Sequence, residues 1–183
     1  MKKSILLIAV SLFIAHVTYA QSQIIGKHFP SITGETLTDK SITLPGDSKG
    51  KYTIIGMAYS RTAEEDLKTW LNPAYNKFIA KTGLLDMDID ANLYFIPMFT
   101  GTNIPIAGKA KQQLKDDTSV EFYPHVLFYK GKLKTYKDEL EFDKKDTGYF
   151  FILDKEGKIV YATSGKYSDQ KMGEMEDILL ELN

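Results

Sequence analysis

The densest run of apolar positions spans residues 52–59, where aromatic, β-branched and small apolar residues follow one another almost without charge. A strand that is covered on both faces has this pattern, so we predict a central buried strand. The next apolar positions recur at helical spacing, and Thr62 and Glu65 form a capping-box pair ahead of them. A helix is therefore predicted to begin at Thr62 or Ala63.

The predicted helix contains a second start signal and leads to a second strand. Asn72 and Pro73 form an N-cap and first-turn pair, so we expect the helix to kink or restart there and to end at Gly83. Residues 84–91 are a connector. Residues 92–99 are apolar on both alternations, which predicts the second buried strand.

Weaker patterns lie on either side of these strands. Residues 33–44 alternate loosely around a polar turn, which predicts a small peripheral hairpin, and residues 45–50 form a loop. After the second strand, residues 100–108 carry a proline and two glycines and are predicted to form a loop over the carboxyl edge of the sheet. Residues 109–116 are predicted to form a short charged helix.

The last third of the chain begins with an aromatic segment, residues 122–129, followed by a turn at Gly131. The charged stretch 132–146 is poorly periodic, and it predicts no element. Residues 148–163 are apolar on both sides of a polar turn at 154–157, which predicts an antiparallel hairpin. A final helix is predicted after the cap residue Ser168, with its apolar face on the sheet: Met172, Met175, Leu179 and Leu182.

The first 20 residues have the pattern of a secretory signal peptide. Two lysines precede the apolar run 5–17, and small residues stand before a cleavage position after Ala20. No cysteine follows to carry a lipid anchor, and no later apolar run is long enough to span a membrane. We therefore expect a periplasmic or secreted protein whose mature chain, residues 21–183, is a single domain.

Composition excludes several kinds of function. The mature chain is slightly acidic, which does not favour nucleic-acid binding. The sequence has no cysteine, which excludes disulfides, thiolate zinc sites and thiol redox chemistry. His28 and His125 lie far apart and outside any metal-ligand spacing, so a structural or solvated role is predicted for each, and neither a metal nor a cofactor is expected.

The order of these elements resembles that of the thioredoxin fold, which implies a three-layer α/β/α domain. Its central mixed sheet would be closed by a C-terminal hairpin and helix. Residues 147–165 resemble the hairpin of TlpA-like and peroxiredoxin-like members, and Gly148 stands where those proteins have a cis-proline. The turn from Ser60 to Glu64 stands where such enzymes carry a cysteine pair. This chain has none.

Two further branches of the fold share short motifs with the chain. Ser60-Arg61-Thr62, a Tyr-Pro pair at Tyr123 and the hairpin residues 153–157 resemble YtfJ-type periplasmic proteins. The Gly148-Tyr149 opening of the hairpin also resembles the mitochondrial ATP synthase assembly factor Atp10. These likenesses imply the fold, and they do not by themselves carry an activity.

The candidate binding residues are those that gather at the predicted turn and hairpin: Ser60, Arg61, Thr62, Gly148 and Tyr149. Arg61 is the only arginine in the chain. It would either hold an anion together with the helix N-terminus or form a salt bridge to Glu64, Glu65 or Asp66 that braces the turn.

No catalytic residue is proposed, because Ser60 has no histidine near it in sequence and no Gly-x-Ser-x-Gly elbow around it. The sequence therefore favours a non-catalytic binding protein that acts as an assembly or chaperone-like factor with a protein partner. Two alternatives remain open, namely a small-anion binding protein that uses Arg61 and a non-thiol enzyme.

Overall fold

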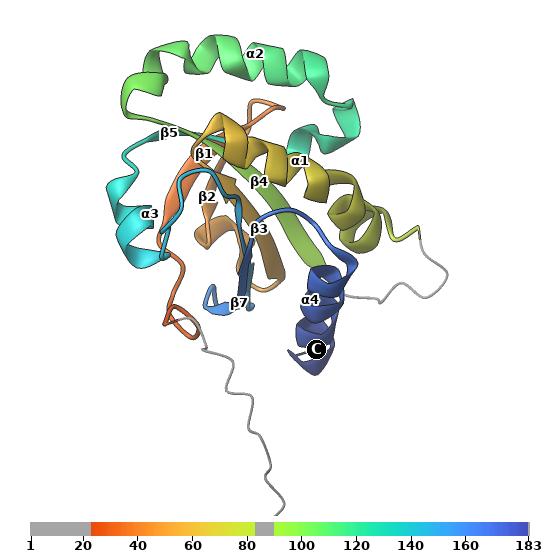
Figure 1. Cartoon of the computed structure of the whole chain (residues 1–183). Helices are drawn as coiled ribbons and strands as arrows, with labels where there is room; N and C mark the ends of the chain where they lie inside the picture. The colour runs from red at the N-terminus through yellow and green to blue at the C-terminus, as the bar shows by residue number, and fades with distance from the viewer. Residues whose placement is uncertain (1–22, 83–89, 183) are drawn as a thin grey trace, which may run out of the picture.

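The computed structural model describes residues 23–82 and 90–182, and in this part of the chain seven strands form one mixed sheet. Their order across the sheet is β2-β1-β5-β4-β3-β6-β7 (Figure 1). The predicted α/β class is confirmed. The strands are β1 Ile32–Thr36, β2 Ser41–Leu44, β3 Tyr52–Ala58, β4 Ala91–Thr100, β5 Leu127–Gly131, β6 Tyr149–Leu153 and β7 Ile159–Ser164.

Strand β3 is an interior strand that is buried along its whole length. It pairs in parallel with β4 and antiparallel with β6, and β4 pairs in parallel with β5. Ile54 enters the apolar core on one face of the sheet, whereas Ile55 and Met57 enter the core on the other. The uncharged sequence of β3 thus follows from burial on both faces, as predicted.

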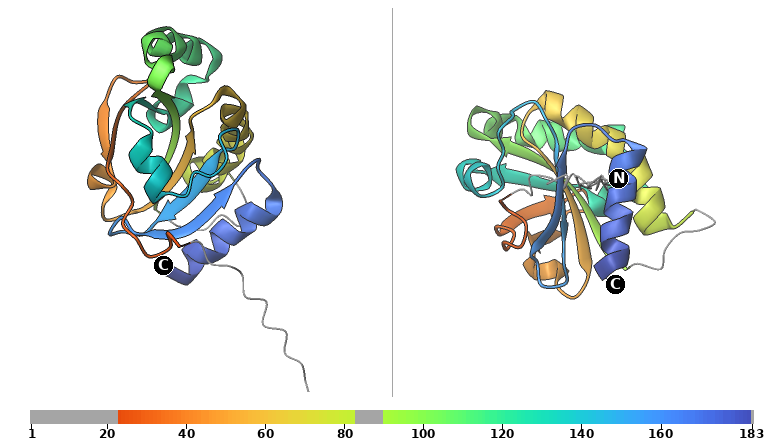
Figure 2. Two further views of the ribbon diagram at one scale, coloured as in Figure 1. Left: turned by 60° about the vertical axis from the view of Figure 1, so that its left-hand side comes forward. Right: turned by 60° about the horizontal axis from the view of Figure 1, so that its bottom comes forward.

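Helices cover both faces of the sheet and give the expected three layers (Figure 2). The helices α1 (Arg61–Tyr75) and α4 (Asp169–Leu182) pack on one face, where Trp70 and Met175 join the same core. The short helix α3 (Lys134–Glu139) packs on the opposite face.

Gly56 in β3 lies beneath α1. A Cβ atom at this position would lie 2.8 Å from Phe150 Cε1, which is closer than real Cβ atoms approach, and 3.0 Å from Leu67 Cδ2, which is a tight contact. The missing side chain therefore lets α1 pack tightly on the sheet. This packing fixes the N-terminus of α1 at the carboxyl end of β3.

The helix after β3 begins and ends differently from the prediction. It begins at Arg61 and not at Thr62 or Ala63. It does not restart at Pro73, because Trp70 and Ala74 on either side are buried against the sheet and hold the helix there.

The change in this helix comes at a π-helical turn, Asn76–Ala80. Lys81 then takes a left-handed conformation, with φ at 50°, and closes the helical segment. The predicted end at Gly83 and most of the predicted connector lie outside the described residues.

Residues 101–117 form two consecutive helices. Gly101–Ile106 is a 3-10 helix, which corrects the predicted loop over residues 100–108. The chain can turn sharply after β4 because Gly101 adopts a positive φ of 56°. Helix α2 (Ala107–Asp117) follows and confirms the predicted charged helix.

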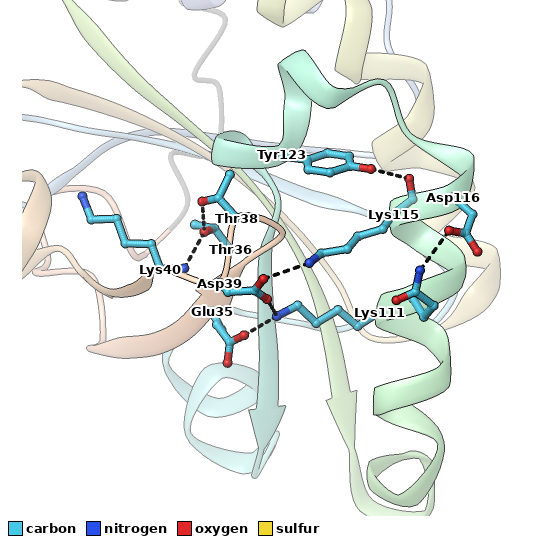
Figure 3. A network of polar contacts seen from close by, with 10 residues as sticks. Glu35, Thr36, Thr38, Asp39, Lys40, Lys111, Lys115, Asp116 and Tyr123 are labelled. Carbon is cyan, nitrogen blue, oxygen red and sulfur yellow. Dashed lines mark hydrogen bonds and ion pairs between the residues drawn. The ribbon is translucent and has the colours of Figure 1, made fainter.

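Ion pairs attach α2 to the β1–β2 hairpin, as Figure 3 shows. Lys111 pairs with Glu35 and with Asp39, where the Nζ–Oδ1 distance is 2.8 Å. Lys115 Nζ lies 3.0 Å from the other carboxylate oxygen of Asp39. The hydroxyl of Tyr123 donates to the carbonyl oxygen of Lys115 at 2.8 Å. Helix α2 is therefore held to the β1–β2 hairpin by ion pairs from Lys111 and Lys115 and to the following segment by the Tyr123 hydrogen bond.

The aromatic segment with a predicted turn also contributes a strand. After a 3-10 helix, Val120–His125, strand β5 inserts between β1 and β4. Helix α3 then lies in the stretch for which the sequence predicts no element. Its six residues are too few for a helical period to show, and it is held by Tyr136, which is buried and donates its hydroxyl to Ser31 O at 2.9 Å.

Both predicted hairpins are confirmed. Strands β1 and β2 pair antiparallel, with β2 at the edge of the sheet, and β6 pairs antiparallel with β7. Ser168 caps α4 by accepting a hydrogen bond from the Lys171 N–H at 3.3 Å, as predicted. Met172, Met175 and Leu179 are buried on the sheet, but the side chain of Leu182, in the last turn of the helix, is exposed.

The predicted signal peptide lies outside the described residues. Over the ranges 23–82 and 90–182, the structure contains no helix with the length and apolar character that a membrane span requires.

Candidate functional site

Ser60 forms the turn between β3 and α1. Its backbone is extended, with φ at −140° and ψ at 158°, and its Oγ accepts a hydrogen bond from the Ala63 N–H at 3.1 Å. The same hydroxyl donates to Asp146 Oδ1 at 2.9 Å. Ser60 is therefore the N-cap of α1 and also ties the turn to the segment that precedes β6.

The predicted capping box at Thr62 and Glu65 is wrong. Both residues lie within the first turns of the helix and are exposed, and Glu65 forms an ion pair with Lys68 at 2.7 Å. The true signal is the Ser60–Ala63 pair, which starts two residues earlier. Ser60 was available to sequence reasoning as a good N-cap residue, but the Thr62–Glu65 spacing matched the box pattern more fully.

Arg61 occupies the first position of α1 and is exposed. In the part of the chain that the structure describes, its guanidinium makes no ion pair. Of its three suggested partners, Glu65 pairs with Lys68 and Asp66 is turned to the interior. Arg61 thus presents a positive charge that makes no ion-pair contact among the described residues, although Glu64 and Glu65 act on it electrostatically, and it lies at the end of the helix where the backbone dipole is also positive.

Asp66 joins α1 to the start of β6. It is 7% exposed, and its Oδ2 accepts a hydrogen bond from the Gly148 N–H at 2.9 Å. A Cβ atom on residue 148 would lie 3.0 Å from Asp66 Cβ and 3.3 Å from Ala63 O. Gly148 therefore lies directly against the first turns of α1, and the structure brings it beside the Ser60 turn.

Tyr149 belongs to a stack of three rings beneath the turn. Phe142 lies between Tyr59 and Tyr149, with ring centroids 5.6 Å and 4.4 Å away. The Tyr149 hydroxyl accepts from the Lys144 N–H at 2.6 Å and donates to the Lys144 carbonyl at 3.0 Å. Burial raises the pKa of Tyr149 above its ordinary value. Tyr149 is thus a buried support of the neighbouring loop, and its hydroxyl is not exposed to a partner.

A pocket of about 380 Å³ opens next to Tyr59 at the carboxyl ends of the three parallel strands. Residues from the turns after β3, β4 and β5 line it, together with residues of the loop before β6. Its charged residues are Lys137, Asp143 and Lys145. Sequence reasoning missed all three because they lie in the stretch without an assigned element. The rule that ligands bind outside the carboxyl ends of parallel strands was the available signal.

The two histidines of the described chain lie away from this site. His125 contacts the Leu93 carbonyl oxygen through Nδ1 at 3.0 Å, near the start of β4, and burial lowers its pKa. His28 is exposed in the N-terminal segment, where its backbone bridges to Lys158. Within the described ranges, no group of three or more potential ligand side chains is placed to hold a metal ion.

The fold defines the class of protein. The thioredoxin domain of a thiol-disulfide oxidoreductase from Bacteroides vulgatus aligns with 85% of this chain and 97% of its own, at 23% identity and a TM-score of 0.52. The exposed lipoprotein thioredoxin Etrx1 from Streptococcus pneumoniae aligns with 84% of this chain and 100% of its own, at 15% identity and a TM-score of 0.54. The chain therefore has a thioredoxin-like fold.

Its family follows from the sequence itself. The sequence profile described as ATP10 protein matches residues 11–182, and the chain therefore belongs to the ATP10 family. No curated protein matches the chain. The resemblance to YtfJ-type proteins stays a prediction.

One further solved structure has a similar fold. BsSco, a member of the Sco family of cytochrome c oxidase assembly proteins, aligns with 84% of this chain and 94% of its own, at 11% identity and a TM-score of 0.56. At this identity the likeness shows the fold alone, as it does for the two thioredoxin-like structures.

Proposed function

We propose that this ATP10-family protein is an exported assembly factor that binds a protein partner and performs no catalysis of its own. The observation that carries the proposal is the bonding of Ser60, which stands where the thioredoxin resemblance places a cysteine pair. Its hydroxyl accepts from Ala63 and donates to Asp146, so both bonds serve to close the turn.

The turn lacks the groups that its fold relatives use for chemistry. The chain has no cysteine, and thiol–disulfide exchange needs a thiolate. A serine nucleophile needs a neighbouring base, and the Ser60 hydroxyl is bonded to the exposed carboxylate of Asp146 and not to a histidine. His125, the stronger candidate base, is bonded near the start of β4 instead. These features support a binding role over catalysis.

The partner contact is placed at Arg61 and Thr62. Both are exposed at the start of α1, and arginine is enriched at protein interfaces because its planar guanidinium pairs well with carboxylates. Gly148 and Tyr149 are buried and support this surface from beneath. Membership in the ATP10 family supports an assembly role, in line with the resemblance to the ATP synthase assembly factor.

Export is part of the proposal. Residues 1–20 have the pattern of a signal peptide with a cleavage position after Ala20, and this pattern supports a mature protein in the periplasm or outside the cell.

A second function is favoured by one observation, the unpaired charge of Arg61. A small carboxylate or phosphate at the N-terminus of α1 would meet both this guanidinium and the free N–H groups of the first turn. In this case Arg61 would hold a free anion and not a partner protein.

Site-specific photo-crosslinking in living cells tests the proposal. A photo-reactive amino acid at Thr62 should form a discrete crosslinked species with another protein. The same amino acid at Lys49 should not form it. Lys49 is exposed and precedes β3, so it lies at the opposite end of this strand from Thr62. If neither position crosslinks while the Thr62 variant remains folded, the partner-binding proposal is wrong, and saturable binding of a small anion that depends on Arg61 would favour the second function.

A further inference from the structure

The pocket beside Tyr59 is built from four separate segments of the chain. Strands β3, β4 and β5 run parallel, and the residues that follow each of them converge at its walls. In open α/β sheets, ligands bind in the crevice outside the carboxyl ends of the strands. A volume of about 380 Å³ lies in the range of small-molecule sites and exceeds what a single water needs.

The walls of this pocket are held in place by the interior. The Tyr149 hydroxyl bonds both backbone groups of Lys144, which fixes the loop that carries Asp143 and Lys145. On the other side, Tyr136 anchors α3 through its bond to Ser31 O, and α3 carries Lys137. The charged groups therefore stand on backbone segments that packing has already positioned.

The pocket carries charged groups of both signs. Lys137 and Lys145 line it together with one acid, Asp143. Across the described residues, neither lysine takes part in an ion pair, so both ammonium groups are available to a ligand. The two ammonium groups face Asp143 in the pocket and Asp146 beside Tyr59, so the site has no excess of positive charge and suits a singly charged carboxylate better than a phosphate dianion. The Asp143 carboxylate can accept a hydrogen bond from an N–H or O–H next to the ligand's own carboxylate.

Tyr59 adds a hydroxyl to this site. The residue is 8% exposed and lines the pocket, yet its hydroxyl has no hydrogen-bond partner within the described part of the chain. No buried side-chain polar atom of the described residues lacks a partner, so this hydroxyl is open to the pocket and to a ligand there. Burial, with Tyr149, Asp146 and Asp143 nearby, raises the pKa of Tyr59, so the hydroxyl keeps its proton at neutral pH and can donate it to an anion.

We propose that this pocket binds a small carboxylate that carries a hydrogen-bond donor beside it, as in an N-acylated amino acid or the C-terminal residue of a peptide. Lys137 and Lys145 hold the carboxylate, Tyr59 donates to it, and Asp143 accepts the neighbouring N–H. This site is separate from Arg61 and does not rest on the proposed partner contact.

An NMR titration of the purified protein with N-acetylglycine tests the proposal. Saturable shifts are expected in the backbone signals of the pocket, led by Gly101 to Asn103 and by Lys145. N-acetylglycinamide keeps the N–H but lacks the charge and should not bind. Propionate keeps the charge but lacks the donor and should bind more weakly than N-acetylglycine. No saturable shift at millimolar N-acetylglycine, or tighter binding of inorganic phosphate, overturns the proposal.

Variants separate the pocket from general surface charge. Lys137→Gln combined with Lys145→Gln should weaken binding about tenfold or more, because charge-assisted hydrogen bonds are lost. Tyr59→Phe removes only the hydroxyl and keeps the ring stacked on Phe142, so affinity should fall several-fold in a folded protein. Lys49→Gln removes an exposed charge elsewhere and should bind as wild type does. Unchanged binding in the double variant would overturn the assignment.

The length of the ligand distinguishes the two possible sources of the carboxylate, which are a peptide C-terminus and a free small molecule. The tripeptide N-acetyl-Gly-Gly-Gly presents the same terminal group on a longer chain. Binding at least as tight as that of N-acetylglycine assigns the pocket to peptide C-termini. A steep loss of affinity with length assigns it to a free small molecule.

Discussion

Gly148 donates its backbone N–H to the carboxylate of Asp66 across 2.9 Å, and this bond is buried. It joins the first residue of the hairpin segment to the second turn of α1, next to the Ser60 turn. The two residues are 82 positions apart in the sequence, so the bond is purely tertiary. It fixes the distance between the two segments that form the candidate site.

Replacing Asp66 with alanine should destabilise the protein by about 1–3 kcal/mol, because the buried Gly148 N–H loses its acceptor. Urea unfolding of both forms measures the difference. Asp177→Ala, which removes an exposed acid from α4, is the control and should change stability by less than about 0.5 kcal/mol. Equal effects of the two substitutions would show that the Asp66 bond is not formed.

Ser60→Ala should cost about 0.5–2 kcal/mol, because the substitution removes the side chain that caps α1 and contacts Asp146. Thr62→Ala is the matched control, since Thr62 is exposed and makes no described side-chain bond. Thermal or urea unfolding distinguishes them. A larger loss at Thr62 would restore the capping box that the sequence predicts.

The fold could be predicted from the sequence where burial leaves a strong pattern. Strand β3 is apolar on both alternations because both of its faces are covered, and the β6–β7 hairpin is bounded by a polar turn with Gly157 at a positive φ of 88°. Helix α3 could not be predicted, because one buried tyrosine in six residues gives no period. The π turn at Asn76–Ala80 likewise has no sequence signal of its own.

The candidate site could be predicted in part for a similar reason. Arg61 and Ser60 stand at a strand-to-helix turn, which is a local pattern. The contacts of Ser60 with Asp146 and of Asp66 with Gly148 join positions more than 80 residues apart, and local spacing carries no information about them. The pocket lysines were missed because only the tertiary fold brings the strand ends together.

The ion pairs of α2 predict a specific acid sensitivity. The Lys111 ammonium, and then that of Lys115, hold the pKa of Asp39 down from 3.8 to about 2 (Figure 3). Since the unfolded chain takes up this proton first, Asp39 adds stability above pH 3.8, and this contribution is lost as the pH falls toward 2. Asp39→Asn should therefore lower stability at neutral pH and flatten the acid limb of the stability curve.

Unfolding measured across this pH range checks the prediction, and added salt should reduce the difference because the carboxylate is exposed. Asp90→Asn, which breaks the exposed pair between Lys51 and Asp90, is the control and should leave the acid limb as in wild type. Identical acid limbs for wild type and Asp39→Asn would contradict the assignment.

Export predicts a defined N-terminus. Intact-mass measurement of the protein from the cell envelope should give a chain that begins at Gln21, because the apolar run ends just before a small-residue cleavage position. A mass that retains residues 1–20 would instead indicate a tethered protein.

The measurement that tests the central claim most directly is crosslinking from Thr62 in cells that carry Arg61→Ala or Arg61→Lys. The account predicts that Arg61→Ala weakens partner capture about ten- to a hundredfold, since a charge-assisted bond is lost, and that Arg61→Lys restores it only in part. The melting temperature should barely move, because Arg61 is exposed and unpaired among the described residues. Unchanged capture together with a large loss of stability would contradict the account and make Arg61 a structural brace.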